Sequence, residues 1–165
     1  MCQNEEKHFR GGVVRWGEYV LKWWSKTQPT LALSSGEAEL AAIVKSTSEG
    51  LGMAAIMQEF GIPVDLTVKS DAVAAIGIVK RQGLGRVRHL AVGDLWVQQR
   101  AKNKEVNYVK LPGTKNTSDI MTKAVEGETI ARHLQSLNMR VRKERHAATP
   151  EYKRGDSGIR GGDPE

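Results

Sequence analysis

The stretch Leu33-Ser34-Ser35-Gly36-Glu37-Ala38-Glu39-Leu40 carries the signal that decides the fold. From residue 35 to about residue 60 apolar residues recur with helical spacing, and Ser34 or Ser35 can cap the first turn. Further along the chain, Ser70-Asp71-Ala72 follows an apolar run and Asn116-Thr117-Ser118-Asp119 opens another segment. Acidic side chains therefore fall on a helix, at a strand end and at a helix start. Such a set typically binds Mg²⁺ or Mn²⁺ through hard oxygen ligands.

Composition limits the class of protein. The chain has 165 residues, of which 39% are hydrophobic and 27% charged, as expected of one globular domain with short extensions. The net charge of +6 indicates an anionic partner. Nucleic acid is favoured over a membrane because no stretch approaches the ~20 apolar residues of a spanning helix. The alternative is a basic surface that binds nothing acidic.

Cysteine content bears on the cellular compartment. The single cysteine, Cys2, excludes an internal disulfide and a cysteine-based zinc site. Residues 1–10 lack the apolar core of a secretory signal. We therefore expect an intracellular protein, with cytoplasm and nucleus left open.

The pattern along the chain predicts an α/β domain. After a polar leader, residues 1–10, aromatic and branched residues predict a hairpin, with Trp16, Trp23 and Trp24 as its packing rather than a base-stacking platform. Gly50 and Gly52 make a break in the long helix possible, and a parallel strand-helix-strand crossover follows it. The expected elements are strands 11–16 and 19–25, helix 35–60, strand 64–69, helices 72–81 and 90–101, strand 105–111, and helices 117–124 and 129–137.

At this level of detail the chain resembles the ribonuclease H region of copia-type retrotransposon polyproteins. The resemblance rests on Leu21–Gln28, Ala32–Glu39, Lys69–Ala75, Gly83–His89, Leu95–Gln98 and Val109–Lys123, in unbroken order. It implies a ribonuclease H-like domain over residues 11–125, a mixed sheet flanked by helices. Residues 126–139 are then a C-terminal helical extension, and residues 140–165 a basic tail too poor in apolar residues to fold alone.

The resemblance also implies a site and a reaction. Glu39, Asp71 and Asp119 match three of the family's four acids, which hold two Mg²⁺ (or Mn²⁺) ions for hydrolysis of the RNA strand of an RNA–DNA hybrid. Periodicity alone does not choose Glu39, because Glu37 lies about 200° away on the helix and nearer the apolar stripe. The choice of Glu39 comes from the family's Glu-Leu-x-Ala pattern.

One departure from the family affects both fold and activity. The family's first aspartate lies on a strand before the hairpin, but no aspartate precedes Asp65 here. We therefore expect the first strand and one catalytic ligand to be missing. The free sheet edge would then be open or filled by a strand from a partner chain.

We predict that a basic loop and the segment before Asp119 bind the nucleic acid. Closely spaced cations contact successive phosphates and release counterions. The alternative is a solvated loop that keeps the chain soluble. The candidate nucleic-acid-binding residues are Lys80, Arg81, Arg86, Arg88, His89, Lys115 and Asn116.

Three functional hypotheses remain at this point. The first is a metal-dependent ribonuclease H-type endonuclease, weakened by the missing aspartate and associated with a reverse transcriptase polyprotein. The second is a noncatalytic nucleic-acid-binding remnant of a retroelement. The third is a marginally folded product that lacks a central strand.

Overall fold

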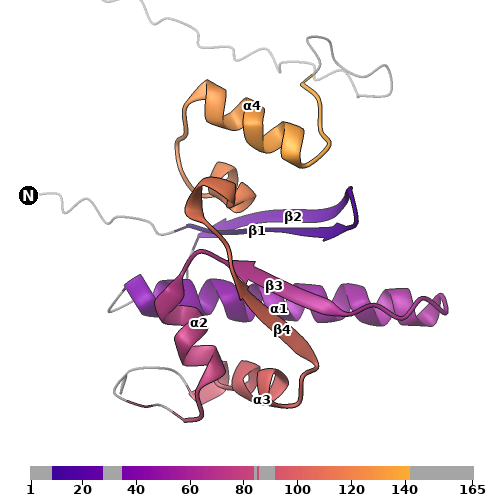
Figure 1. Ribbon diagram of the computed structural model, residues 1–165, viewed down its shortest axis with the longest axis vertical. Coiled ribbons are helices and arrows are strands. Elements are labelled where there is room, and N and C mark those ends of the chain that lie inside the picture. The colour runs from indigo at the N-terminus through magenta and orange to yellow at the C-terminus, as the bar shows by residue number, and fades with distance from the viewer. Residues whose placement is uncertain (1–8, 28–34, 84, 86–91, 142–165) are drawn as a thin grey trace, which may run out of the picture.

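The computed structural model describes residues 9–27, 35–83, 85 and 92–141. Within this part the chain is a mixed α/β structure with four α-helices and two small two-stranded sheets. Figure 1 shows α1 extending along both sheets, α2 and α3 together at one end, and α4 beyond the hairpin at the other. The leader up to residue 8 and the tail from residue 142 lie outside the described residues.

The first sheet is an antiparallel hairpin. β1 (Phe9–Trp16) pairs with β2 (Tyr19–Thr27) through a turn at Gly17, whose φ of +57° glycine tolerates without strain. The Trp24 indole lies against Gly12, where a Cβ would come within 2.1 Å of the ring. β1 begins at Phe9, so this strand reaches into the segment expected to be polar leader.

The expected packing role of the tryptophans holds only in part. Trp24 is 8% exposed and belongs to the buried residues. Trp16 and Trp23 are 48% and 58% exposed, so for them the expectation was wrong. Trp24 shares its face of β2 with Lys22, which bonds to Glu49 of α1, so this face is turned toward α1 and Trp23 points to the opposite side. Trp16 is the last residue of β1, next to the turn.

The long helix α1 (Ser35–Glu59) runs unbroken through Gly50 and Gly52. Gly50 is buried against β3, where an added Cβ would lie 2.7 Å from a methyl carbon of Leu66. Gly52 has nothing within 4 Å of the same position. The predicted break is therefore absent, and Gly50 serves close helix–strand packing instead.

The second sheet is the parallel pair predicted for the crossover. β3 (Leu66–Ser70) pairs in parallel with β4 (Val106–Lys110), and α2 (Val73–Lys80) and α3 (Trp96–Lys102) lie between them in sequence. Val68, Val106 and Tyr108 point into a core that α1, α2 and α3 complete. The Tyr108 hydroxyl lies 3.1 Å from the Thr47 hydroxyl, which donates to the Ile43 carbonyl and so satisfies the buried polar groups.

Several expected helices are shorter than predicted. The 90–101 segment contains a 3-10 turn, η1 (Val92–Asp94), before α3, and residues 86–91 lie outside the described part. The 117–124 segment forms a 3-10 helix, η3 (Thr117–Met121), preceded by η2 (Gly113–Lys115). The last predicted helix is α4 (Gly127–Ser136). Among the described residues, no helix is both long and apolar enough to cross a bilayer.

The two sheets remain separate in the described part of the chain. No strand joins β1 to β3, so the single mixed sheet implied by the resemblance is not formed by these residues. The structure therefore establishes a mixed α/β arrangement, without the continuous sheet of the expected fold.

Candidate functional site: a carboxylate pocket

Glu39, Asp71 and Asp119 line one pocket of about 440 Å³. The pocket lies where the first turns of α1, the end of β3 and the η3 segment meet. The three acids are far apart in the sequence and come from three different elements. Their side chains therefore border one space, and their role as ligands of a common centre stays a prediction.

Asp71 is positioned by the end of the parallel sheet. It follows Ser70, the last residue of β3, whose carbonyl accepts a hydrogen bond of 2.8 Å from the Leu111 amide. The Ser70 hydroxyl accepts a further bond of 3.2 Å from the Ala72 amide, which shapes the turn into α2. Asp71 therefore sits on backbone that is fixed on both sides, as a ligand position requires.

Asn116 connects Asp71 to Asp119. Its Nδ2 donates to Oδ1 of Asp71 at 3.2 Å and to Oδ1 of Asp119 at 3.0 Å. Its Oδ1 accepts from the Ser118 amide at 3.2 Å, which caps η3 and fixes which side of the amide faces the carboxylates. Two like charges are therefore held near one another by a single shared donor group.

Glu39 lies at the edge of the same pocket. Its side chain is exposed and has no hydrogen-bond or ion-pair partner among the described residues. Glu37 is less exposed and does not line this pocket. The position of the two side chains thus agrees with the choice of Glu39 over Glu37.

Cations also line the pocket. The Lys123 ammonium lies 3.1 Å from Oδ2 of Asp119, and Arg10 and Lys69 contribute two further positive side chains. The Lys123 side chain is 60% exposed, so the ion pair is weak. The three positive and three negative side chains make the pocket nearly neutral without a bound ion.

The donor set suits a metal ion only in part. Asp71 and Asp119 present hard carboxylate oxygens that share one partner, the Asn116 amide, so both can reach a common cation. Among the described residues, no three acidic, histidine or cysteine side chains are grouped closely enough to hold a metal ion. The residues thus fit one weakly held divalent cation and not a two-ion centre.

The predicted nucleic-acid-binding residues do not share a single location. Lys80 ends α2 and Arg81 follows it, whereas the carboxylate pocket touches the opposite, Ala72 end of that helix. Lys115 lines a neighbouring groove, and Asn116 lies among the carboxylates. Arg86, Arg88 and His89 lie outside the described residues.

Sequence reasoning missed a side chain that holds the start of the basic loop. Gln98 on α3 is buried, and its Nε2 donates to the Ile78 carbonyl at 2.9 Å and the Gly83 carbonyl at 3.1 Å. Its Oε1 accepts from the Gly83 amide at 2.9 Å. A glutamine in an otherwise apolar helix face was the available signal, since buried amides are normally hydrogen-bonded.

Comparison with known proteins shows a distant relation to a retroelement polyprotein. Over 124 residues, 74% of the chain, the sequence is 28% identical to the "Retrovirus-related Pol polyprotein from transposon TNT 1-94" of Nicotiana tabacum. The chain spans only 9% of that polyprotein's length. No protein-family profile matches, and no solved structure matches. The chain is therefore distantly similar to a copia-type retrotransposon Pol polyprotein, with the corresponding region of the polyprotein left open.

Proposed function

We propose that this chain is a retrotransposon-derived, ribonuclease H-like domain that binds RNA–DNA hybrids and cleaves their RNA strand slowly. The observation that carries the proposal is the shared pocket of Glu39, Asp71 and Asp119, in which Asp71 and Asp119 bond to one Asn116 amide. The distant similarity to a retrotransposon Pol polyprotein supports it. The net charge of +6 fits a polyanionic substrate.

Asp71 and Asp119 would hold a divalent cation, Mg²⁺ or Mn²⁺, and Glu39 would approach it from the rim of the pocket. When bound, such an ion supplies charge stabilisation at a phosphodiester and lowers the pKa of a bound water. The protein's own part is positional. The β3 end fixes Asp71, Asn116 sets the spacing to Asp119, and Lys69 and Arg10 attract the phosphate.

Slow turnover is expected for two reasons. The described carboxylates fall short of the family's four acids, and small errors in the position of a reacting group reduce rates steeply. In addition, Lys123 must release Asp119 before a cation can take its place. Both reasons also favour the second hypothesis, a noncatalytic hybrid-binding remnant.

A cleavage assay on an RNA–DNA hybrid with a labelled RNA strand tests the proposal. We expect Mg²⁺- or Mn²⁺-dependent cleavage by the wild-type chain and its loss in Asp71→Asn. Asp65→Asn is the matched control, because Asp65 is exposed just before β3 and does not line the carboxylate pocket. Hybrid binding without cleavage in all three proteins would support the noncatalytic remnant, and cleavage that survives Asp71→Asn would exclude this pocket as the active site.

A further inference from the structure

A second hollow, which we call the groove, separates the two sheets. Its volume is about 830 Å³, and α1 forms its floor through Ser46, Gly50, Met53, Ala54 and Met57. Both β1 and β3 line it, and Figure 1 shows these two strands running in opposite directions.

β1 and β3 border the groove along their edges, and Leu21 and Trp24 of β2 also line it. Five consecutive residues of β1, Gly12 to Trp16, and four consecutive residues of β3, Leu66 to Lys69, line it. Successive side chains of a strand point to opposite faces, so an unbroken run of lining residues means that the edge itself borders the space. Each of these strands is paired on one side only in the described part of the chain. Two unpaired rows of backbone donors and acceptors therefore face the same groove.

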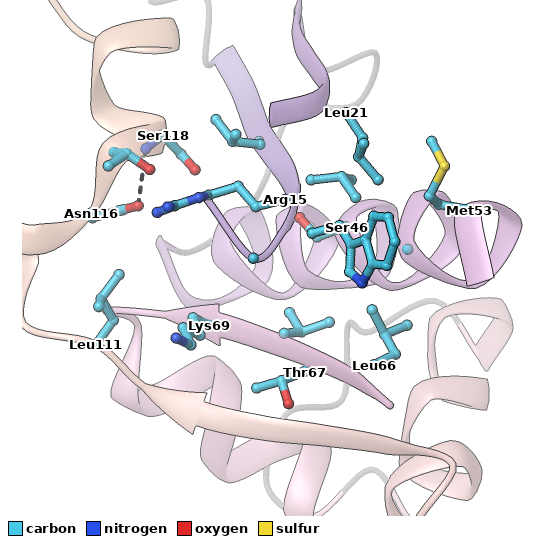
Figure 2. Close-up of a pocket in the computed structure, with 18 of the residues that line it drawn as sticks. Arg15, Leu21, Ser46, Met53, Leu66, Thr67, Lys69, Leu111, Asn116 and Ser118 are labelled. Carbon is cyan, nitrogen blue, oxygen red and sulfur yellow. Dashed lines mark hydrogen bonds between the residues drawn. The ribbon is translucent and has the colours of Figure 1, made fainter. Parts of the chain in front are cut away.

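The groove has an apolar end and a cationic end. Figure 2 shows Leu21, Met53 and Leu66 around one end, and Arg15 and Lys69 near Asn116 at the other. Arg15, Lys69 and Lys115 have no ion-pair partner among the described residues, and Asp65 is the one acidic residue of the described chain that lines the groove. The cationic end continues into the carboxylate pocket, because Ser46, Lys69, Asn116 and Ser118 line both.

We propose that the groove binds an extended polypeptide strand from another protein, with apolar side chains followed by acidic ones, which pairs with β1 and β3 and joins the two sheets. Backbone edges on both sides require an occupant that donates and accepts along its length, which a peptide strand does and a compact apolar ligand does not. At ~3.3 Å per residue, the two lining edges hold about five residues of such a strand. The cationic end selects acidic side chains.

The direction of the strand also follows. β1 presents the longer lining edge, and antiparallel pairing is somewhat more stable per residue than parallel pairing. A strand antiparallel to β1 is parallel to β3 and enters at the apolar end, so its apolar half precedes its acidic half. This inference does not depend on nuclease activity.

The test uses the full chain and a ten-residue synthetic peptide whose first half alternates valine with threonine and whose second half alternates aspartate with valine. Binding is followed by tryptophan fluorescence, since Trp16 and Trp24 line the groove. We expect saturable one-to-one binding. Two further peptides carry N-methylated backbone amides at either the odd or the even positions. Each keeps its side chains but loses its donors toward one of the two strands, so each should bind at least tenfold more weakly.

Two pairs of protein variants locate the site. Ala54→Trp fills the floor of the groove and should weaken binding at least tenfold, whereas Ala55→Trp, on the exposed neighbouring position of α1, should change it less than twofold. Arg15→Glu should weaken binding of the acidic peptide about tenfold, and Lys102→Glu on α3 should not. Circular dichroism verifies that each variant folds. If Ala54→Trp does not fold, the comparison of Arg15→Glu with Lys102→Glu and the methylated peptides still test the proposal.

The proposal would be overturned by absence of binding, or by methylated peptides that bind as tightly as the unmethylated one. Equal effects of Ala54→Trp and Ala55→Trp would also exclude the groove. Concentration-dependent self-association of the chain that Ala54→Trp abolishes would assign the groove to a second copy of the chain instead. None of these results depends on hybrid cleavage, so failure here and failure of the proposed nuclease function are separate outcomes.

Discussion

Asn116 links the two aspartates of the carboxylate pocket. Its amide nitrogen donates to both Asp71 and Asp119 and so lies between the two carboxylates. The amide donors offset part of the repulsion between the two negative charges, as hydrogen bonds to the ionised form do. A neutral amide group therefore keeps the two acidic side chains close together.

Replacing Asn116 by aspartate should convert the pocket into a stronger cation site. Asn116→Asp adds a third carboxylate beside Asp71 and Asp119 and removes their shared donor. Without divalent ions we expect the stability to fall by about 1–3 kcal/mol. With Mg²⁺ at about a hundred times its Kd, the melting temperature should rise by roughly 5–10 °C.

Melting curves with and without Mg²⁺ measure this effect. Asn107→Asp, at an exposed position of β4 outside both pockets, is the matched control and should show no Mg²⁺-dependent rise beyond that of the wild type. An equal response of the two variants would mean that Asn116 does not mark a cation site.

Between elements, an ion-pair cluster joins the hairpin to α1. Glu49 on α1 accepts from Lys22 of β2 and from Lys45 one helical turn earlier. Hydrogen bonds from these two lysines lower the pKa of Glu49 from its ordinary 4.5 to about 2. Because the folded-state pKa is depressed, the stability that this carboxylate contributes is present above about pH 4.5 and is lost as the pH falls toward 2.

Glu49→Gln should therefore be less stable than the wild type at pH 7, by at most about 1 kcal/mol since the lysines are partly exposed. The difference should shrink between pH 4.5 and pH 2. Denaturant unfolding at several pH values measures it, with Glu59→Gln at the exposed end of α1 as control. A difference that does not change with pH would show that the substitution acts through packing.

Gly50 and Gly52 of α1 give a matched test of helix–strand packing. Gly52→Ala should raise the free energy of unfolding by about 0.5–1 kcal/mol, because alanine favours the helix and the site is open. Gly50→Ala gains the same propensity but must displace Leu66, and overpacking typically costs about 1–3 kcal/mol. Urea unfolding should therefore rank Gly52→Ala above Gly50→Ala. The reverse order would mean that Leu66 moves away without cost.

These elements also show what the sequence can and cannot predict. Periodicity placed α1, β3 and β4 within about two residues of their observed bounds, because their signals are local. It predicted an α-helix where η3 is a 3-10 helix, since the two differ only in which carbonyl each amide reaches. In the site, the motif predicted that Glu39, Asp71 and Asp119 would meet. The bridging amide of Asn116 depends on tertiary geometry that no local pattern encodes.

In the whole molecule, the separation of the two sheets is the least predictable feature. Which strands pair depends on which segments reach the space between two strand edges. The sequence of one strand does not specify which strand will lie beside it. Lys69, near the end of β3, lines both the groove between the sheets and the carboxylate pocket. Lys69 is therefore a cation without an ion-pair partner, among the described residues, that borders both hollows.

Hybrid binding should depend on salt through cations such as Lys69. Each phosphate contact releases counterions, so loss of one contact reduces the slope of log affinity against log salt concentration by about one. We expect Lys69→Gln to bind an RNA–DNA hybrid more weakly and with such a reduced slope. Lys102→Gln, at an exposed position of α3, should keep the wild-type slope, because Lys102 lines neither the groove nor the carboxylate pocket. Fluorescence anisotropy between 50 and 200 mM salt, about the range over which such contacts change affinity most, measures both slopes. If the two variants had equal slopes, the hybrid would contact another face of the protein, and the carboxylate pocket would have no substrate within reach.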